Sequence, residues 1–494
     1  YEITDFPFFS FLWADLHAHL IALPFTLLFV GSALALVLSG RQRAGSGGWR
    51  SYLAERLPWQ QVGLLVTLSL GLGALRATNS WDFPTYLLVG AGAVAIVELA
   101  WRRRIDVDTV FWIAVKTGLL YALSSLLFWP YISNYKLFYS GVDRSKTSTA
   151  LWQYFGIHGL FIFIILTFLA WALYRSLRRT SPPALSPLEG EGERNLGDTP
   201  PTPTKGASPL WTLHLADNVT ERRWRRWLMA LAGMLLIAEL VAIFGFHFST
   251  VAFLLVPLAA VVALAIGTYL RRGPALGADL FLLLMLAVAL SIGVGVDLVT
   301  VKGDIERMNT VFKFYFQAWA LFGVAAACCL WWLLGNGFAS ARRLLALRRL
   351  WLGVLVFLLA AVLVYPVMAT PARAKQRFNA LPPTLDGMAY MKSAVDQDEK
   401  GNIDLIWDYQ ALTWMQDNIQ GSPVVLEGNA PQYRWGGRVS VYTGLPTVIG
   451  WEWEQKQQRW DYMYTVDERL RDVQAMYATP DANAALSLLR KYGV

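Results

Sequence analysis

The chain has 494 residues, of which 55% are hydrophobic and only 16% are charged. Because soluble globular proteins are about one-quarter charged, this composition excludes an ordinary soluble enzyme or binding domain. The net charge of +8 does not indicate nucleic acid as a partner, since basic residues gathered in the loops between apolar runs account for much of it. The two cysteines, adjacent at Cys328 and Cys329, provide neither a disulfide framework nor a zinc pattern.

Apolar runs long enough for a helix to cross a bilayer recur along the first three-quarters of the chain. We therefore expect a polytopic α-helical membrane protein with about ten spans, and the lipid bilayer as its first partner. The predicted spans cover residues 18–40, 60–76, 84–101, 109–128, 153–174, 227–246, 248–270, 278–298, 310–336 and 350–369.

Arginines follow every second span, for example at Arg102, Arg103 and Arg104. The positive-inside rule places these loops in the cytoplasm, and the opposite loops and everything after Thr370 outside. Residues 180–209 are rich in Pro, Gly and Ser and predict a disordered cytoplasmic linker within the membrane domain 1–370.

Two charged residues fall within predicted spans. Lys116, near a cytoplasmic end, is expected to extend its ammonium to the interface. Glu239 lies deep in the sixth span, where a carboxyl is either protonated and hydrogen-bonded or functional.

Hydrophobicity falls after Thr370, and residues 371–494 predict a soluble α/β domain on the outer side. We expect helices over 404–419, 466–477 and 481–492, and strands over 422–427 and 438–444. A further strand is expected next, and the chain starts at Tyr1 without a methionine. It is therefore expected to be part of a longer polypeptide, with this domain incomplete at its C-terminus.

Asp15, His17 and His19 lie immediately before the first span, on the outer side. A carboxylate beside imidazoles suits a general base, or a divalent metal such as manganese or zinc. The alternative is that these residues cap the helix and anchor it at the membrane interface.

Further polar residues lie on the same side. Glu306, Asn309 and Lys313 share one face at the start of the ninth span, which indicates either a site or a charged helix start. The loop around Asp143 offers a mixed patch suited to phosphate or carboxylate, or a solvated surface. The candidate substrate-binding residues are Asp82, Asp143, Arg144, Lys146, Glu306, Arg307, Asn309, Lys313, Arg434 and Arg438.

The arginines at 434 and 438 stand beside aromatic residues, as in a sugar or phosphate site or in a contact between a domain and a membrane. The chain has no P-loop, Rossmann fingerprint or G-x-S-x-G motif, so ATP-driven transport by the chain itself is not expected.

Several long runs in the chain resemble the bacterial and archaeal "YYY" membrane-protein family, whose function is unknown. These runs are FPFFSFLWADLHAH, NSWDFPTY, FYSGVDRSKTSTALWQYFGIHG, GDIERMNTVFKFYFQAW and YRWGGRVSVYTGLPTVIGWEWEQKQQR. The family usually has proline where this chain has Ala18, which leaves the titratable residues of the motif intact. More remotely, the family is similar to the GT-C superfamily of membrane glycosyltransferases.

The GT-C resemblance implies an enzyme that moves a sugar from a polyprenyl-phosphate carrier to an acceptor on the outer face of the cytoplasmic membrane. Asp15 would then be the base, and His17 and His19 would orient it or hold a metal. Lys313 and the arginines at 307 and 144 would bind the phosphate leaving group. We further expect Asp15, Asp82, Asp143, Glu306 and Lys313 to surround one cavity.

Two other functions remain open. One is a transporter or lipid flippase, and the other is a non-catalytic membrane subunit that anchors a partner complex through its outer domain.

Overall fold

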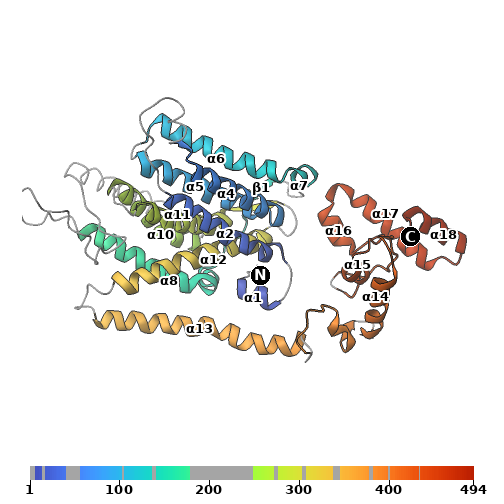
Figure 1. Cartoon of the computed structure of the whole chain (residues 1–494). Coiled ribbons are helices and arrows are strands. Elements are labelled where there is room, and N and C mark those ends of the chain that lie inside the picture. The colour runs from blue at the N-terminus through green and yellow to red at the C-terminus, as the bar shows by residue number, and fades with distance from the viewer. Residues whose placement is uncertain are drawn as a thin grey trace, which may run out of the picture. The chain divides into compact units, whose positions relative to one another are not determined.

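The computed structural model describes most of the chain (Figure 1). The described residues are 6–13, 17–39, 56–102, 105–135, 141–178, 249–271, 276–302, 307–337, 345–377, 382–398, 401–432 and 434–494. They divide into two compact units. The first contains residues 1–135, 142–301 and 305–362, and the second contains residues 136–141, 302–304 and 363–494.

The described part of the chain contains nine helices that are long and apolar enough to cross a membrane. They are α2 (Ala18–Leu38), α4 (Trp59–Thr78), α5 (Asp82–Arg102), α6 (Val107–Leu127), α8 (Leu151–Arg178), α10 (Ser249–Arg271), α11 (Leu276–Leu298), α12 (Arg307–Trp332) and α13 (Leu345–Arg377). Helices are thereby confirmed at nine of the ten predicted spans, with ends that differ by up to eight residues. The sixth predicted span, Glu239 within it, and the linker at 180–209 lie outside the described residues.

Shorter elements join the spans of the first unit. Helix α1 (Pro7–Trp13) precedes α2, and α7 (Trp129–Asn134) follows α6. Strand β1 (Gly141–Arg144) pairs with β2 (Val299–Lys302), so the segments that precede α8 and α12 are held together. A π-helical turn, Leu333–Gly337, continues α12.

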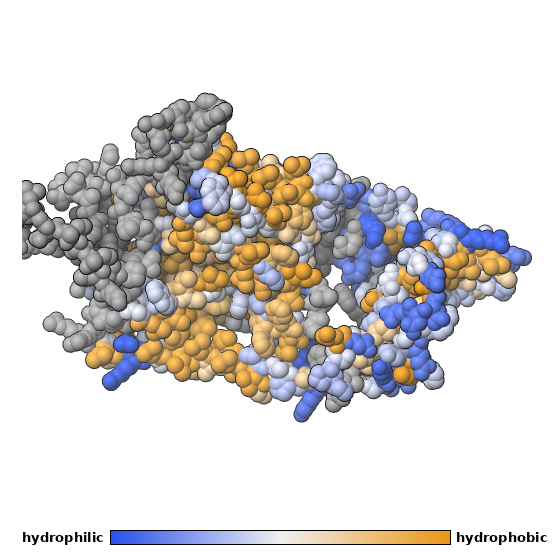
Figure 2. Space-filling model, in the orientation of Figure 1, coloured by the Kyte–Doolittle hydropathy of each residue, from blue (hydrophilic) through white to orange (hydrophobic). Residues whose placement is uncertain are grey.

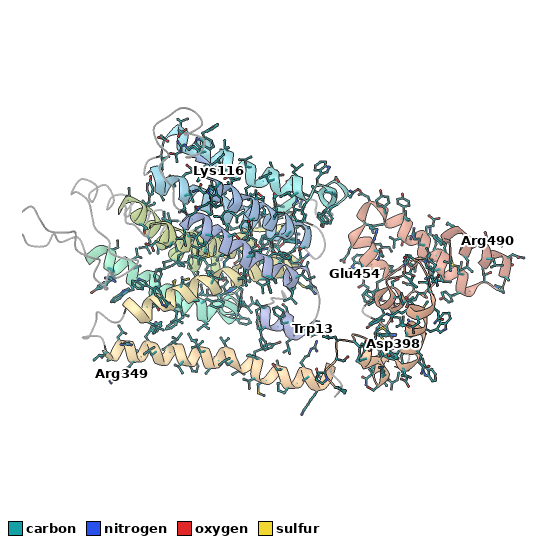
Figure 3. All side chains as sticks on the ribbon, in the orientation of Figure 1. Trp13, Lys116, Arg349, Asp398, Glu454 and Arg490 are labelled. Carbon is teal, nitrogen blue, oxygen red and sulfur yellow. The ribbon has the colours of Figure 1, made fainter. Side chains whose placement is uncertain are left out.

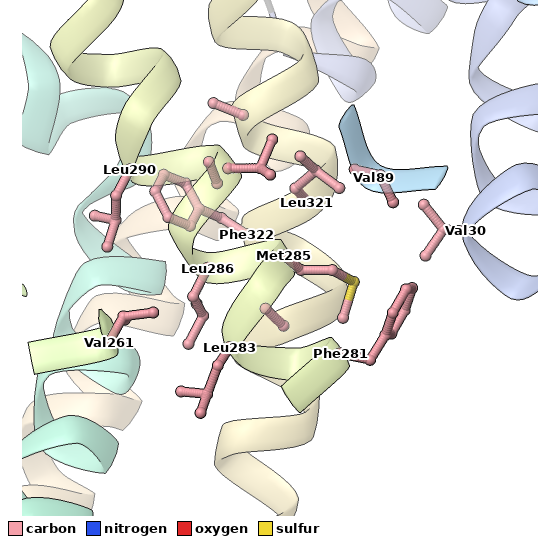
Figure 4. Close-up of a cluster of buried hydrophobic side chains, with 14 of the residues drawn as sticks. Val30, Val89, Val261, Phe281, Leu283, Met285, Leu286, Leu290, Leu321 and Phe322 are labelled. Atoms are coloured by element: carbon pink, nitrogen blue, oxygen red, sulfur yellow. The ribbon is translucent and has the colours of Figure 1, made fainter. Parts of the chain in front are cut away.

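Helix α11 lies at the centre of the hydrophobic core of the first unit. It packs against α10, α12, α5 and α2. Its side chains Phe281, Met285 and Leu286 are buried beside Leu321 and Phe322 of α12 (Figure 4). On the face drawn in Figure 2, apolar residues also cover much of the outside of the bundle. Burial inside and apolar surface outside are what a helix bundle in lipid requires, because only helices or closed barrels satisfy their backbone groups there.

A buried group of charges joins α4, α5 and α6 on the side of the bundle that the positive-inside rule predicts to be cytoplasmic. The Lys116 ammonium lies 2.8 Å from a Glu98 carboxylate oxygen and 3.2 Å from Gln61 Oε1, and the side chain is buried (labelled in Figure 3). Arg56 pairs with the same glutamate and with Asp108. The prediction that Lys116 extends to the interface is therefore wrong, because a partner on the neighbouring helix compensates its charge inside the bundle.

The second unit is mostly helical in its described residues. Strands β3 (Val395–Asp398) and β4 (Gly401–Asp404) form an antiparallel pair, and Val425 bridges Thr447 in parallel. The helices are α14 (Ile406–Asn418), α15 (Arg438–Thr443), α16 (Glu452–Gln458), α17 (Met463–Ala478) and α18 (Ala482–Tyr492). The predicted helices at 404–419, 466–477 and 481–492 are confirmed, but the described residues do not show the predicted α/β domain.

The predicted strand at 438–444 is a helix, α15, and its start has a clear local cause. The backbone N–H groups of Arg438 and Val439 donate to the carboxylate of Glu427, at 3.1 and 3.3 Å. An acidic group at the first turn satisfies free N–H groups and interacts favourably with the helix dipole. Gly437 and Gly444 take left-handed conformations at the two ends, with φ of 69° and 75°. The alternating pattern of RVSVYTG therefore led to a wrong prediction of a strand. The segment is helical because Glu427, a residue distant in the sequence, caps it.

Candidate functional site

The starts of α2, α5 and α12 bring several of the predicted site residues together at the end of the bundle that topology assigns to the outer side. His17 is the N-cap residue of α2, with extended backbone angles, and its side chain makes no capping hydrogen bond. The structure thus gives no support to helix capping as the role of His17. Asp15 and Glu306 lie outside the described residues, so their positions stay predictions.

The two histidines differ in their surroundings although their rings are only 5.3 Å apart. His17 is exposed, whereas His19 is 2% exposed. The His19 ring packs edge-on against Phe312 and Phe316 of α12, with ring centroids 4.9 and 4.6 Å away. This contact fixes the start of α2 against the first turns of α12, because the histidine fills a gap between two aromatic rings.

Asp82 lies against the same turns of α12. It begins α5 and is buried, and its Oδ1 accepts a hydrogen bond from Asn79 Nδ2 at 3.0 Å. The Lys313 ammonium acts electrostatically on this carboxylate. Gln317 Nε2 donates to the backbone oxygen of Trp81 at 3.1 Å, which ties α12 to the turn between α4 and α5.

We call the residues gathered here the helix-start cluster. Its members are His17, His19, Asn79, Asp82, Lys313 and Gln317. Lys313 is half-buried, and its ammonium lies 5.0 Å from the centre of the Phe312 ring. The cluster therefore combines a buried carboxylate, two imidazoles and an ammonium on three helix starts that are far apart in the sequence.

Arg307, a predicted phosphate ligand, has partners inside the protein. The buried guanidinium donates to Asp297 at 2.7 Å and to Thr149 Oγ1 at 2.9 Å. It also donates to Ser145 Oγ at 3.1 Å and to the backbone oxygen of Val296. These bonds join the start of α12 to the end of α11 and to the segment between β1 and α8, which is the arrangement of a structural ion pair.

The remaining candidates in the first unit differ in their solvent exposure. Asn309 is buried at the start of α12. Asp143 and Arg144 are exposed on β1, where the Arg144 N–H donates to Asp143 Oδ1 at 3.0 Å, and Lys146 is exposed just beyond. This exposed group keeps both interpretations open, the anion-binding patch and the solvated loop.

Arg434 and Arg438 belong to the second unit. The Arg438 guanidinium bridges two carboxylates, Asp408 at 2.8 Å and Glu427 at 3.1 Å. The indole N–H of Trp435 donates to the same aspartate at 2.6 Å. Burial raises the pKa of the Glu427 carboxyl, and the Arg438 charge opposes that rise. The guanidinium at 438 thus holds the domain together by bridging α14 to the start of α15.

A metal at this site would need a third ligand besides the two imidazoles. Among the residues that the structure describes, no group of three or more His, Cys, Asp or Glu side chains could hold a metal ion. Asp15, the third member of the predicted set, lies outside that part of the chain. The metal interpretation therefore depends on Asp15.

The sequence interpretation missed two acidic residues that the bundle buries. Glu98 compensates Lys116, and Asp297 compensates Arg307. The basic residues were themselves a signal in the sequence, because a basic side chain that is buried among apolar helices requires an acidic partner on a neighbouring helix. The periodicity of one helix does not reveal which neighbour supplies it.

The nine long apolar helices among the described residues, with their buried core, indicate a multi-pass membrane protein. The chain belongs to the family described as "Uncharacterized membrane protein (DUF2298)", which matches residues 1–322. No curated protein and no solved structure matches the chain. The resemblance to a membrane-protein family of unknown function is thereby confirmed, whereas the comparisons give no evidence for similarity to the GT-C superfamily.

Proposed function

We propose that this chain is a membrane glycosyltransferase of the GT-C type, which moves a sugar from a polyprenyl-phosphate carrier to an acceptor on the outer face of the cytoplasmic membrane. One observation carries the proposal. An ammonium, a buried carboxylate and two imidazoles lie together in the helix-start cluster. One of the imidazoles, His17, is two residues after Asp15 in the sequence. A transfer from a lipid phosphate needs a base for the acceptor and a cation for the leaving group.

The proposed reaction is a single displacement. The Asp15 carboxylate takes the proton of the acceptor hydroxyl while the oxygen attacks the anomeric carbon of the donor sugar. The bond from that carbon to the phosphate oxygen breaks, and the oxygen leaves with the electron pair. Lys313 stabilises the negative charge that grows on the phosphate, and His17 orients the base or the acceptor. Configuration at the anomeric carbon is inverted, because one attack occurs from the face opposite the leaving group.

The surroundings of Lys313 support its proposed role. Asp82 acts on it from α5, and the Phe312 ring lies under its ammonium. Partial burial removes water from the ammonium and makes its attraction to a phosphate oxygen stronger than at an open surface. Asn79 holds the Asp82 carboxylate by a hydrogen bond, so the carboxylate balances the lysine when no phosphate is bound.

The test uses the full chain in lipid nanodiscs with a panel of polyprenyl-monophosphate hexoses, and it follows release of polyprenyl phosphate by mass spectrometry. Asp15→Asn should abolish release without weakening donor binding. Asp417→Asn, at an exposed position of α14, is the matched control and should release at the original rate. Full release in Asp15→Asn, at the rate of the control, would refute the catalytic role.

A transporter or lipid flippase is the second candidate, and charged residues within the spans favour it. Glu98 with Lys116 and Asp297 with Arg307 lie inside the bundle, where ionisable groups frequently mark transport paths. Each is, however, compensated by its partner. The test follows movement of a fluorescent lipid between the leaflets of proteoliposomes. Movement that persists in Asp15→Asn, with no release of polyprenyl phosphate from donors, would favour this candidate.

A further inference from the structure

Three buried side chains of the bundle carry polar atoms that make no hydrogen bond to any residue that the structure describes. Tyr154 and His158 lie on α8, Asp297 lies on α11, and each is 0% exposed. The atoms without a partner are the Tyr154 hydroxyl, both imidazole nitrogens of His158 and Oδ2 of Asp297. Four such atoms on three neighbouring residues are unusual, because buried polar groups nearly always find a partner.

The three residues surround one region between α8, α11 and α12. Tyr154 and His158 are four residues apart and share a face of α8, with ring centroids 4.8 Å apart. The Tyr154 hydroxyl lies over Gly293 of α11, one turn before Asp297, where a Cβ atom would lie 3.2 Å from the phenolic oxygen. The Asp297 carboxylate acts electrostatically on Tyr154. Tyr315 of α12 closes the third side, with its ring 5.3 Å from His158.

The charges around this region determine what it can bind. Asp297 Oδ1 is paired with Arg307 at 2.7 Å and also accepts from Thr149. The pair is electrically balanced, so the region offers no net charge to hold a free ion. What it offers is one carboxylate oxygen as acceptor, a phenolic hydroxyl, and an imidazole that accepts at one nitrogen and donates at the other. A neutral guest that both donates and accepts hydrogen bonds satisfies all of them.

Water is the smallest such guest, and buried water typically bonds to about three otherwise unsatisfied polar groups. We propose that Tyr154, His158 and Asp297 form a hydrated site inside the bundle, through which protons reach the imidazole of His158. The titratable and charged groups that face this site are Tyr154, Tyr315, Asp297 and Arg307. The site adjoins the start of α8 and the end of α11, where Thr149 donates hydrogen bonds to Asp297 Oδ1 from its backbone N–H and its hydroxyl.

The proton transfer changes no bond between heavy atoms. Water bonded to the acceptor nitrogen of His158 gives it a proton and takes one in turn from the next water toward the outer end. The imidazolium that forms returns its proton by the same route. The site is separate from the helix-start cluster, and the inference does not depend on the proposed glycosyl transfer.

Hydrogen exchange at the imidazole C2 position tests this inference residue by residue. The exchange proceeds through the protonated ring and needs water at the ring, so it reports both properties that the site requires. The full chain in lipid nanodiscs is incubated in heavy water and digested, and each histidine peptide is followed by mass spectrometry. His17, which is exposed, is the internal positive control.

His158 is expected to exchange measurably although it is fully buried, and more slowly than the exposed His17, because burial disfavours the protonated ring. Tyr154→Phe removes one of the groups that hold the water. It should slow exchange at His158 by about tenfold, the factor that corresponds to the loss of one hydrogen bond, and leave His17 unchanged. Tyr121→Phe, the same change at an exposed position of α6, should leave His158 exchange as it was.

A dry site gives the opposite results. No exchange at His158 even over a period many times longer than His17 needs for full exchange would overturn the inference. So would a higher melting temperature in Tyr154→Phe than in Tyr121→Phe, because removing a hydroxyl that binds nothing relieves an unsatisfied polar group.

Discussion

Replacing Arg307 by methionine tests whether this arginine holds the bundle together. Methionine keeps much of the length and apolar volume of the side chain and removes its charge. Asp297 would then be a buried carboxylate without its ion-pair partner at 2.7 Å, although Thr149 still donates to it from its backbone N–H at 2.9 Å and its hydroxyl at 2.8 Å. The hydrogen bonds from Arg307 to Ser145 and Val296 are lost as well.

Breaking one side of a buried pair typically costs about 3–5 kcal/mol. We expect about 3 kcal/mol here, because the remaining hydrogen bonds from Thr149 compensate part of the charge. The assay is the free energy of unfolding in mixed micelles, from denaturant titration followed by tryptophan fluorescence. A second change, Asp297→Asn, in the methionine variant removes the uncompensated charge and should recover part of the loss.

The structural role of Arg307 would be refuted if Arg307→Met changed the free energy of unfolding by less than about 0.5 kcal/mol, the range of an exposed ion pair. If the single change were small and polyprenyl-phosphate binding were lost, Arg307 would be a substrate ligand, as the sequence pattern suggested.

Three further predictions concern the second unit and the topology. Glu427→Gln should destabilise the second unit by about 1–2 kcal/mol in thermal unfolding, since α15 loses its acidic cap; an unchanged transition would contradict the capping role. Burial raises the pKa of Asp472, but hydrogen bonds from Lys491 and the neighbouring tyrosine outweigh it and lower the pKa overall. The contact between α17 and α18 should therefore be fully present above the ordinary carboxyl pKa of about 3.9 and be lost as the pH falls through the lowered value. Amide hydrogen exchange in α18 should become faster on acidification. In Asp472→Asn, which has no carboxyl at this position, the exchange should not show this change with pH. After removal of the two native cysteines, an impermeant thiol reagent added outside should label Lys400→Cys and not Asn195→Cys, and the reverse pattern would overturn the predicted orientation.

Hydrophobic run length was enough to predict the nine long helices that the structure describes. Helices in lipid must satisfy their own backbone groups, so an apolar run of sufficient length has few alternatives to a helix. Helix α2, predicted at 18–40, is Ala18–Leu38, and α11, predicted at 278–298, is Leu276–Leu298. The segment at 438–444 lacked this constraint. Its valines alternate as in a strand, but Glu427, eleven residues earlier, caps it as a helix.

The candidate site was predictable only in part, for a similar reason. Topology placed Asp82 and Lys313 at one end of the bundle, and the structure brings them within electrostatic contact. Packing then decided the rest. His19 became buried between aromatic rings while His17 stayed exposed, and Arg307 turned to Asp297 on the adjacent helix. No pattern within one helix shows which neighbour it will meet.

Binding of polyprenyl phosphate to the full chain tests the helix-start cluster most directly. Native mass spectrometry of the protein in nanodiscs gives the bound fraction at each lipid concentration, for Lys313→Ala and for the matched control Lys392→Ala, an exposed lysine of the second unit. We predict that Lys313→Ala weakens binding by at least about tenfold, equivalent to roughly 1.4 kcal/mol for one charge-assisted contact. The control should bind as the unaltered protein does. Equal affinity in Lys313→Ala and the control would contradict a phosphate site at this cluster.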